Sequence, residues 1–319
     1  MLRRRILGLP SPVLIGILLI FLLLLVIGFI GGPLGKSIFG DLGLPSWLSV
    51  SRPAPELPAE EIFHLFGFPI TNSIIGAWIT IIFLVGFSYV VTRRMKVVPG
   101  RLQSAFEALL GWLYNFCKNV AGEKYGRQFF PVVATIFLFV AFNAWLSLIP
   151  GFGSIWVATA GGEHAHLLRG ANTDINTPLA LALVSFVFVE FFGLRAGGIR
   201  YLGKFFNISQ FSGSVVHIFK GRLRAGLGGL ITGFINIFVG LLEALSELVR
   251  IISFTFRLFG NMTAGEILLL IAIFLIPWGF AVVFYGLELL VGFVQALIFG
   301  GLTLVFLTLA TAHHGVEST

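Results

Sequence analysis

Cysteine is almost absent from this sequence, since Cys117 is the only one in 319 residues. A single cysteine excludes an internal disulfide and excludes a metal site built from several cysteines. We therefore predict that Cys117 is a packing residue. Histidine is also scarce, and none of the six falls inside a long apolar run, so a catalytic His/Asp pair at membrane depth is excluded. We expect no metal and no cofactor, with solvated histidines in an outer loop and the tail: His164, His166, His313 and His314.

Charged residues are few and apolar residues are many. Charged residues make up 11% of the chain and hydrophobic residues 57%, and the mean hydropathy is +0.99. These values are far from those of a soluble globular domain and place the chain in a membrane. The net charge of +7 does not indicate nucleic acid, because the basic residues cluster at the ends of apolar runs. Lipid is therefore the expected surrounding.

Two further patterns are missing. The sequence has no phosphate loop of the form G-x-x-x-x-G-K-[ST], so we do not expect this chain to bind nucleotide. It also has no repeat of fixed period, which argues against an inverted-repeat transporter. A secondary cation or proton antiporter stays the alternative function, because such a protein would also bury carboxylates and a cation.

Long apolar runs are what the sequence does contain. They predict an all-α polytopic membrane protein with helices over residues 12–30, 74–91, 129–149, 178–194, 227–276 and 279–311. The first run follows Arg3, Arg4 and Arg5 and offers no clear cleavage site, so we predict a retained signal anchor. The expected organisation is an N-terminal membrane anchor at 1–32, an outer loop at 33–72 and a channel domain at 73–319.

The basic residues also predict an orientation. With the N-terminus inside, sixteen of the 21 Lys and Arg residues fall on the cytoplasmic side, and only Lys36, Arg52 and Arg169 fall outside. Positively charged loops stay cytoplasmic, so both termini are expected there. A bacterial plasma (inner) membrane is the expected location.

Two segments depart from a simple upright span. Residues 102–120 place apolar side chains at helical spacing, which predicts an amphipathic helix at the cytoplasmic interface or a hairpin arm packed beneath its neighbours. Residues 227–276 contain no proline and would extend about 75 Å as one helix, against a hydrocarbon core of about 30 Å. With 279–311 they predict two long, strongly tilted antiparallel helices over about 227–312, joined at Pro277 and Trp278.

Ionisable residues are rare in the run 227–276, which makes each of them informative. Five occur there: Glu243, Glu247, Arg250, Arg257 and Glu266. A charge at membrane depth is costly and is seldom found without a partner or a function. Arginine is the extreme case, because it stays protonated at any biological pH. Arg257 is therefore the main candidate for a functional residue.

Helical spacing groups these residues by face. Glu243, Arg250 and Arg257 are seven apart and nearly superimpose, and Asn261 follows Arg257 on the same side. Glu247 precedes Arg250 by three residues, which predicts an ion pair. Glu266 faces about half a turn away from Arg257. On the last helix, one face carries Glu288 and Gln295.

Four sequence segments resemble one family. Residues 257–266 (RLFGNMTAGE) closely resemble the R-L-F-G-N-x-x-A-G-E signature of subunit a of F-type ATP synthases, the stator ion-channel subunit. In the same order, residues 143–151 (NAWLSLIPG), 174–183 (DINTPLALAL) and 295–299 (QALIF) resemble further segments of that subunit. The resemblance covers about residues 60–314. The N-terminal anchor has no counterpart in many members, and the 198–229 loop is longer than usual.

The resemblance implies a function and a set of partners. In that family the two tilted helices lie against a ring of c subunits, and the arginine, here Arg257, faces the ring between two offset half-channels. It forces rotor carboxylates to lose their proton, which couples ion flow to rotation. Glu266 and Glu288 match half-channel carboxylates on the outer side. The expected partners are the c-subunit ring, b-type peripheral stalk subunits and the remaining synthase subunits. The chain is not an enzyme on its own, and the expected ion is a proton, with sodium left open.

Each candidate also has a simpler interpretation. Arg257 could be a snorkelling or paired arginine, and Glu266 and Glu288 could be hydrogen-bonded carboxylates that hold two helices together. Asn261 and Gln295 are as well suited to orienting helices as to touching the ion path. Glu243 could instead be a solvated carboxylate, an alternative of nearly equal weight. Asp174 and Asn176 could equally well cap the helix that begins near residue 178.

Overall fold

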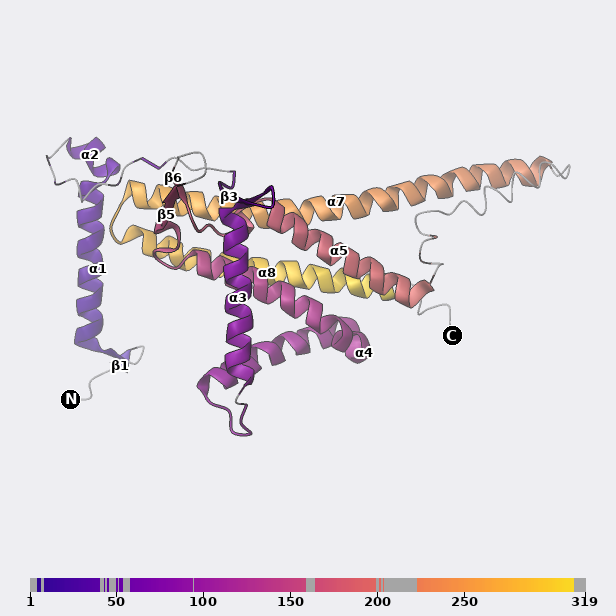
Figure 1. The fold of residues 1–319 in the computed structure, drawn as a ribbon, viewed down its shortest axis with the longest axis horizontal. Coiled ribbons are helices and arrows are strands. Elements are labelled where there is room, and N and C mark those ends of the chain that lie inside the picture. Colours follow the sequence, from indigo (N-terminus) through magenta and orange to yellow (C-terminus); the bar gives the residue numbers. More distant parts are fainter. Residues whose placement is uncertain are drawn as a thin grey trace. The chain divides into compact units, whose positions relative to one another are not determined.

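The computed structural model describes residues 5–6, 9–40, 43, 45, 50, 52–53, 58–93, 95–158, 164–198, 201, 203 and 223–312. The arginines at the N-terminus, His313, His314 and most of the 198–229 loop lie outside the described residues. Figure 1 shows the elements in chain order. They are β1 (Arg5–Ile6), β2 (Leu9–Pro10), α1 (Ser11–Gly31), α2 (Pro33–Phe39), β3 (Glu61–Leu65), β4 (Phe68–Thr71), α3 (Asn72–Thr92), α4 (Arg101–Ser147), η2 (Phe152–Ser154), β5 (Trp156–Ala158), β6 (His164–His166), η3 (Ala171–Thr173), α5 (Asn176–Gly197), α7 (Leu223–Leu275) and α8 (Phe280–Ala312).

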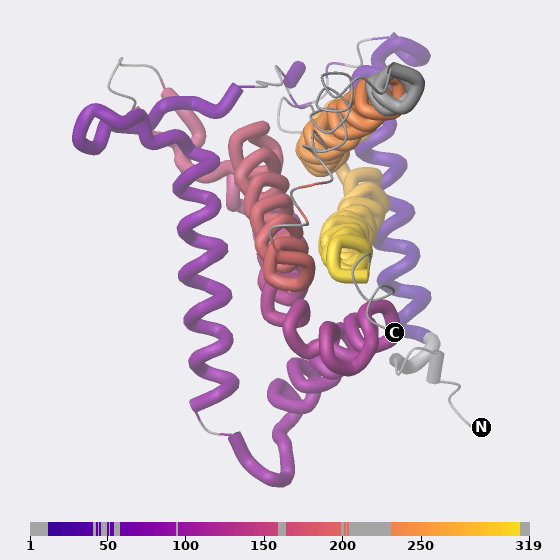
Figure 2. The backbone as a smooth tube through the Cα atoms, turned by 90° about the vertical axis from the view of Figure 1, so that its right-hand side faces the viewer, coloured from indigo at the N-terminus to yellow at the C-terminus, as the bar shows by residue number. Residues whose placement is uncertain are grey.

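The fold is all-α and polytopic, as the apolar runs predict. Within the described ranges, six helices are long and apolar enough to cross a membrane: Pro12–Gly31, Asn72–Thr92, Arg101–Ser147, Asn176–Gly197, Ile231–Leu275 and Phe280–Ala312. Each corresponds to one predicted run. The backbone of α3 is an unbroken coil in Figure 2. Many large apolar side chains on these helices are exposed, as expected for surfaces that meet lipid.

Helix α4 is two helices joined by a sharp reversal. Its 47 residues are interrupted at Gly122, where φ is 77° and ψ is 173°. Glycine tolerates this backbone conformation because it has no Cβ. The arms fold onto one another (Figure 1), and an added Cβ on Gly126 would lie 2.9 Å from the carbonyl oxygen of Cys117. Of the two alternatives for residues 102–120, the structure shows the hairpin arm. Cys117 is buried in it, as predicted.

The C-terminal helices begin and end close to their predicted limits. Helix α7 is one helix of 53 residues without proline, and α8 has 33 residues. The connection is a turn over residues 276–279 that contains the predicted Pro277 and Trp278. Gly279 has a positive φ of 86°, which lets the backbone reverse direction within this short connection.

Short β-hairpins are the feature that the sequence does not predict. Strands β3 and β4 pair antiparallel, with Leu65 opposite Phe68, and β5 pairs with β6, with Trp156 opposite His166. These segments are too short to show a clear alternation of apolar and polar residues. Both hairpins lie in segments predicted as outer loops.

The described chain divides into two compact units. The first contains residues 1–80, 141–174 and 260–294, and the second contains residues 81–140, 175–259 and 295–319. Four of the five boundaries fall inside α3, α4, α7 and α8, so each of these helices contributes to both units; the fifth falls just before α5. The first unit contains the cavity described next, and the second contains Arg257.

Candidate functional site

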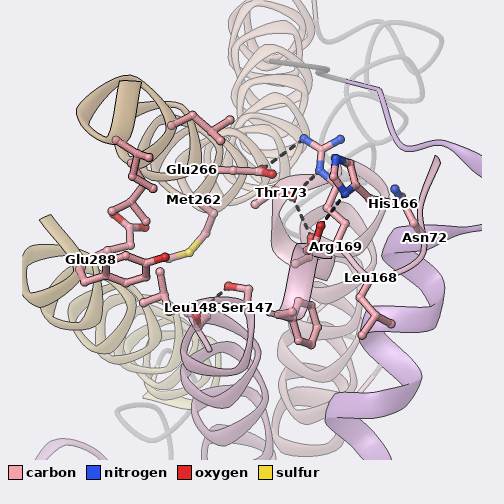
Figure 3. A pocket seen from close by; sticks show the side chains of 18 of the residues that line it. Asn72, Ser147, Leu148, His166, Leu168, Arg169, Thr173, Met262, Glu266 and Glu288 are labelled. Carbon is pink, nitrogen blue, oxygen red and sulfur yellow. Dashed lines mark hydrogen bonds and ion pairs between the residues drawn. The ribbon is translucent and has the colours of Figure 1, made fainter. Parts of the chain in front are cut away.

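The first unit contains a cavity of about 290 Å³ with both polar and apolar walls. Two carboxylates of the C-terminal helices, Glu266 of α7 and Glu288 of α8, line it. The segments around η2, β6 and η3 also line it, and Figure 3 shows His166 and Arg169 across the cavity from Glu288. Other polar lining residues are Glu60, Asn72, Ser147, His166, Arg169, Thr173 and Tyr285. The cavity thus brings polar groups from several separate segments of this unit to one place.

Arg169 is the cation of this cavity, and it pairs with Glu266. One guanidinium nitrogen, Nη2, lies 3.3 Å from Glu266 Oε2, and the two side chains point toward one another in Figure 3. Arg169 is 9% exposed and Glu266 is 39% exposed. The spacing on α7 predicts that Glu266 faces away from Arg257. The ion pair with Arg169 could not be predicted, because the two residues are 97 positions apart.

Glu288 has a different environment. It is buried at 8% exposure, and its carboxyl group lies directly against the backbone of Gly265 on α7. A Cβ placed on Gly265 would be 2.1 Å from either carboxylate oxygen, far inside contact distance. Within the described residues no cation pairs with Glu288. The Glu288 carboxyl group therefore occupies space that is open only because Gly265 has no side chain.

A buried polar network joins the motifs around Asn143 and Asp174. The side-chain amide of Asn143 donates to Thr80 Oγ1 at 2.9 Å, and its oxygen accepts from the backbone N–H of Asn172 at 3.2 Å. Asp174 is buried, and its Oδ2 accepts a hydrogen bond from the Ser73 hydroxyl at 2.7 Å. These bonds fix the loop that carries Arg169 to α3 and α4.

The second unit contains two arginines of α7 with different surroundings. Arg250 Nη1 lies 2.6 Å from Glu247 Oε2, which confirms the predicted ion pair, and its guanidinium sits 3.7 Å from the centre of the Phe306 ring. Arg257 is half-buried, and its polar contact is with Ser253 Oγ at the long distance of 3.5 Å. Among the described residues, Arg257 has no carboxylate partner.

The other candidates are dispersed. Gln295 is buried on α8, while Glu243 is half-buried on α7. Asn261, on α7, and Asn176, at the start of α5, are exposed. The roles considered for these four residues stay predictions.

Comparison with known proteins identifies the family. Residues 74–308 match the sequence model of the ATP synthase A chain. The chain belongs to the ATP synthase A chain family. The subunit a of Desulfosudis oleivorans is 31% identical over 264 residues, which cover 81% of this chain and 98% of that protein. The subunit a of Moorella thermoacetica is 27% identical, with 77% and 94% covered, and that of Gloeobacter violaceus is 31% identical, with 76% and 85% covered.

Membership in the ATP synthase A chain family confirms the resemblance that the four sequence segments predict. Together with the six apolar helices, it makes the chain a multi-pass integral membrane protein. Arg169 is a lining residue that the sequence does not predict. The signal that could have indicated it is its position as the only Lys or Arg of the 151–176 loop, five residues before Asp174. Glu60, another lining residue, precedes the matched range.

Proposed function

We propose that this chain is the ion-translocating membrane subunit of an ATP synthase. In this proposal Arg257 faces a ring of c subunits and forces their carboxylates to release a proton. The observation that carries the proposal is the environment of Arg257. Arg169 and Arg250 each have a carboxylate partner within the chain, and Arg257 has none among the described residues. A charge at membrane depth needs a partner, so we infer that its partner belongs to another chain.

The surface of α7 around Arg257 supports this assignment. Residues on the same side of the helix are exposed and small or polar: Ser253, Gly260, Asn261 and Ala264. Residues on the other side are buried: Leu258, Met262 and Leu269. The buried Phe254 ring lies beside Arg257, with its centre 5.9 Å from the guanidinium carbon. Small residues let two membrane helices approach closely, as a passing rotor helix would require. Arg257 is the one cation of this exposed side between Ser253 and Ala264.

The size of the electrostatic effect is sufficient for the mechanism. Two unit charges about 4 Å apart attract by about 4 kcal/mol at an effective dielectric constant of about 20. That energy corresponds to a shift of about three units in the pKa of a rotor carboxylate. A carboxylate that is protonated in lipid would therefore ionise beside Arg257. The membrane potential supplies a comparable drive of about 2.3 kcal/mol per charge per 100 mV.

The cavity of the first unit is the proposed outer access route. It contains Glu266 and Glu288, which we assign to that half-channel, and the network of Asp174 and Asn143 adjoins it. Glu243, Asn261, Gln295 and Asn176 are proposed as further residues along the ion path. The c-subunit ring, b-type stalk subunits and the other synthase subunits are the proposed partners. The proposed location is a bacterial inner membrane with both termini cytoplasmic.

Replacement of the central arginine tests this function. Arg257→Ala should abolish ATP-driven proton pumping into membrane vesicles while the complex still assembles, because rotor carboxylates would no longer be compelled to ionise. The matched control is Arg195→Ala, which removes an exposed arginine at the end of α5 and should leave pumping intact. Normal pumping by assembled Arg257→Ala complexes would refute the proposal.

A further inference from the structure

Glu266 and Glu288 share one cavity but differ in their charged neighbours. Glu266 is paired with the Arg169 guanidinium at 3.3 Å. Glu288 has no cation partner within the described part of the chain. The titratable and charged groups that line the cavity with them are Glu60, His166, Arg169 and Tyr285. Arg169 is the only permanent positive charge in this set.

Arg169 is held rigidly in place. Its Nε donates to Thr173 Oγ1 at 3.1 Å, and its Nη1 donates to the backbone carbonyl of Pro58 at 3.0 Å. The carbonyl oxygen of Arg169 packs against Gly76 of α3, where a Cβ would lie only 2.1 Å away. These contacts hold both the guanidinium group and the backbone of Arg169.

The segment before the family-matched residues completes this arrangement. Pro58 supplies the carbonyl that accepts from Arg169. Glu60 Oε2 accepts from the backbone N–H of His166 at 2.9 Å and from the Asn72 amide at 3.3 Å. These bonds tie residues 58–60 to the loop that carries Arg169. The cation is thus positioned by its own loop, by α3 and by the preceding segment.

We propose that Arg169 is a positioning residue that pairs with Glu266 and keeps its carboxylate directed into the cavity. The exchange of the ion then falls to Glu288, which lies against Gly265 without a cation partner in the described structure. This inference rests on the proposed function, because it assigns separate tasks to the two carboxylates of one access route.

The pumping rates of substituted complexes test this division. Arg169→Gln removes the partner that directs Glu266, so the initial rate of ATP-driven proton pumping should fall by about tenfold. Arg169→Lys keeps a cation at this position and should retain more of the rate. Arg52→Gln, which replaces an exposed arginine of the predicted outer loop, should pump normally.

A double variant separates positioning from a purely structural role. If Arg169 acts through Glu266, then Arg169→Gln should cause no further loss of pumping rate in a Glu266→Gln background. Normal pumping by Arg169→Gln, or the same fold loss in both backgrounds, would overturn the inference. Arg257→Ala distinguishes the two proposals: normal pumping by that variant refutes the proposed function. Loss of pumping there, with normal pumping by Arg169→Gln, refutes only the role of Arg169.

Discussion

Three arginines show how far the partner of a charged residue can be predicted from the sequence. Arg250 could be paired with Glu247 from the sequence because they lie three positions apart on one helix. Arg257 could be singled out because its motif and its membrane depth are both local features. Arg169 could not be singled out, because its proposed role depends on an ion pair with Glu266 that only the tertiary fold creates. Helical spacing gives the direction of a side chain and not the residue that it meets.

Gly265 offers a test at the residue scale. Gly265→Ala would place a methyl group 2.1 Å from the Glu288 carboxylate oxygens, so the carboxyl group must move. We expect the proton pumping rate to fall on the order of tenfold, because misplacing a reacting group by about 1 Å can cost that much or more. The measurement is the initial rate of ATP-driven vesicle acidification.

A glycine elsewhere provides the control for this test. Gly86, on α3, has open space where a Cβ would be, so Gly86→Ala should pump normally. Equal rates for Gly265→Ala and wild type would show that Glu288 does not depend on this close approach, and would weaken its assignment to the ion path.

At the scale of elements, the sequence predicted the helices well because long apolar runs and their periodicity are local properties. The limits of α7 and α8 depend on a stretch without proline followed by the turn at Pro277 and Trp278. The sequence leaves two alternatives for residues 102–120, because the presence of Gly122 alone does not show that its φ is positive and that the chain reverses there. The β3–β4 and β5–β6 hairpins were missed because strands of three to five residues have almost no periodic signal.

Helix α1 supports a prediction at this scale. It contacts the α7–α8 connection at Gly28, where a Cβ would lie 2.7 Å from the backbone nitrogen of Trp278. Just after α1, a Cβ on Gly32 would lie 2.3 Å from the carbonyl oxygen of Leu275 at the end of α7. Gly28→Leu should therefore separate α1 from this turn and lower the thermal unfolding midpoint of the purified complex by several degrees.

The same helix contains the matched control. Gly16 has open space around its position, so Gly16→Leu should leave the unfolding midpoint unchanged. If both variants unfold at the same temperature, α1 does not stabilise the protein through this contact. Because α1 precedes the matched residues 74–308, pumping is expected to continue in both variants.

At the scale of the whole molecule, the family could be predicted because its signature is a continuous stretch of ten residues on one helix. The cavity could not, because its lining comes from seven separate segments of the chain. Each compact unit contributes one part of the proposed mechanism, the first unit the two carboxylates and the second unit Arg257. The predicted division into anchor, outer loop and channel domain stays a prediction.

The central claim is that Arg257 presents a fixed positive charge to rotor carboxylates between two separate access routes. The most direct test is a map of the assembled synthase that measures the separation between the Arg257 guanidinium and the nearest ring carboxylate. We predict a separation within about 6 Å, the range over which an opposite charge favours ionisation. A guanidinium turned away from the ring, or one continuous water-filled pore running past it, would contradict the account.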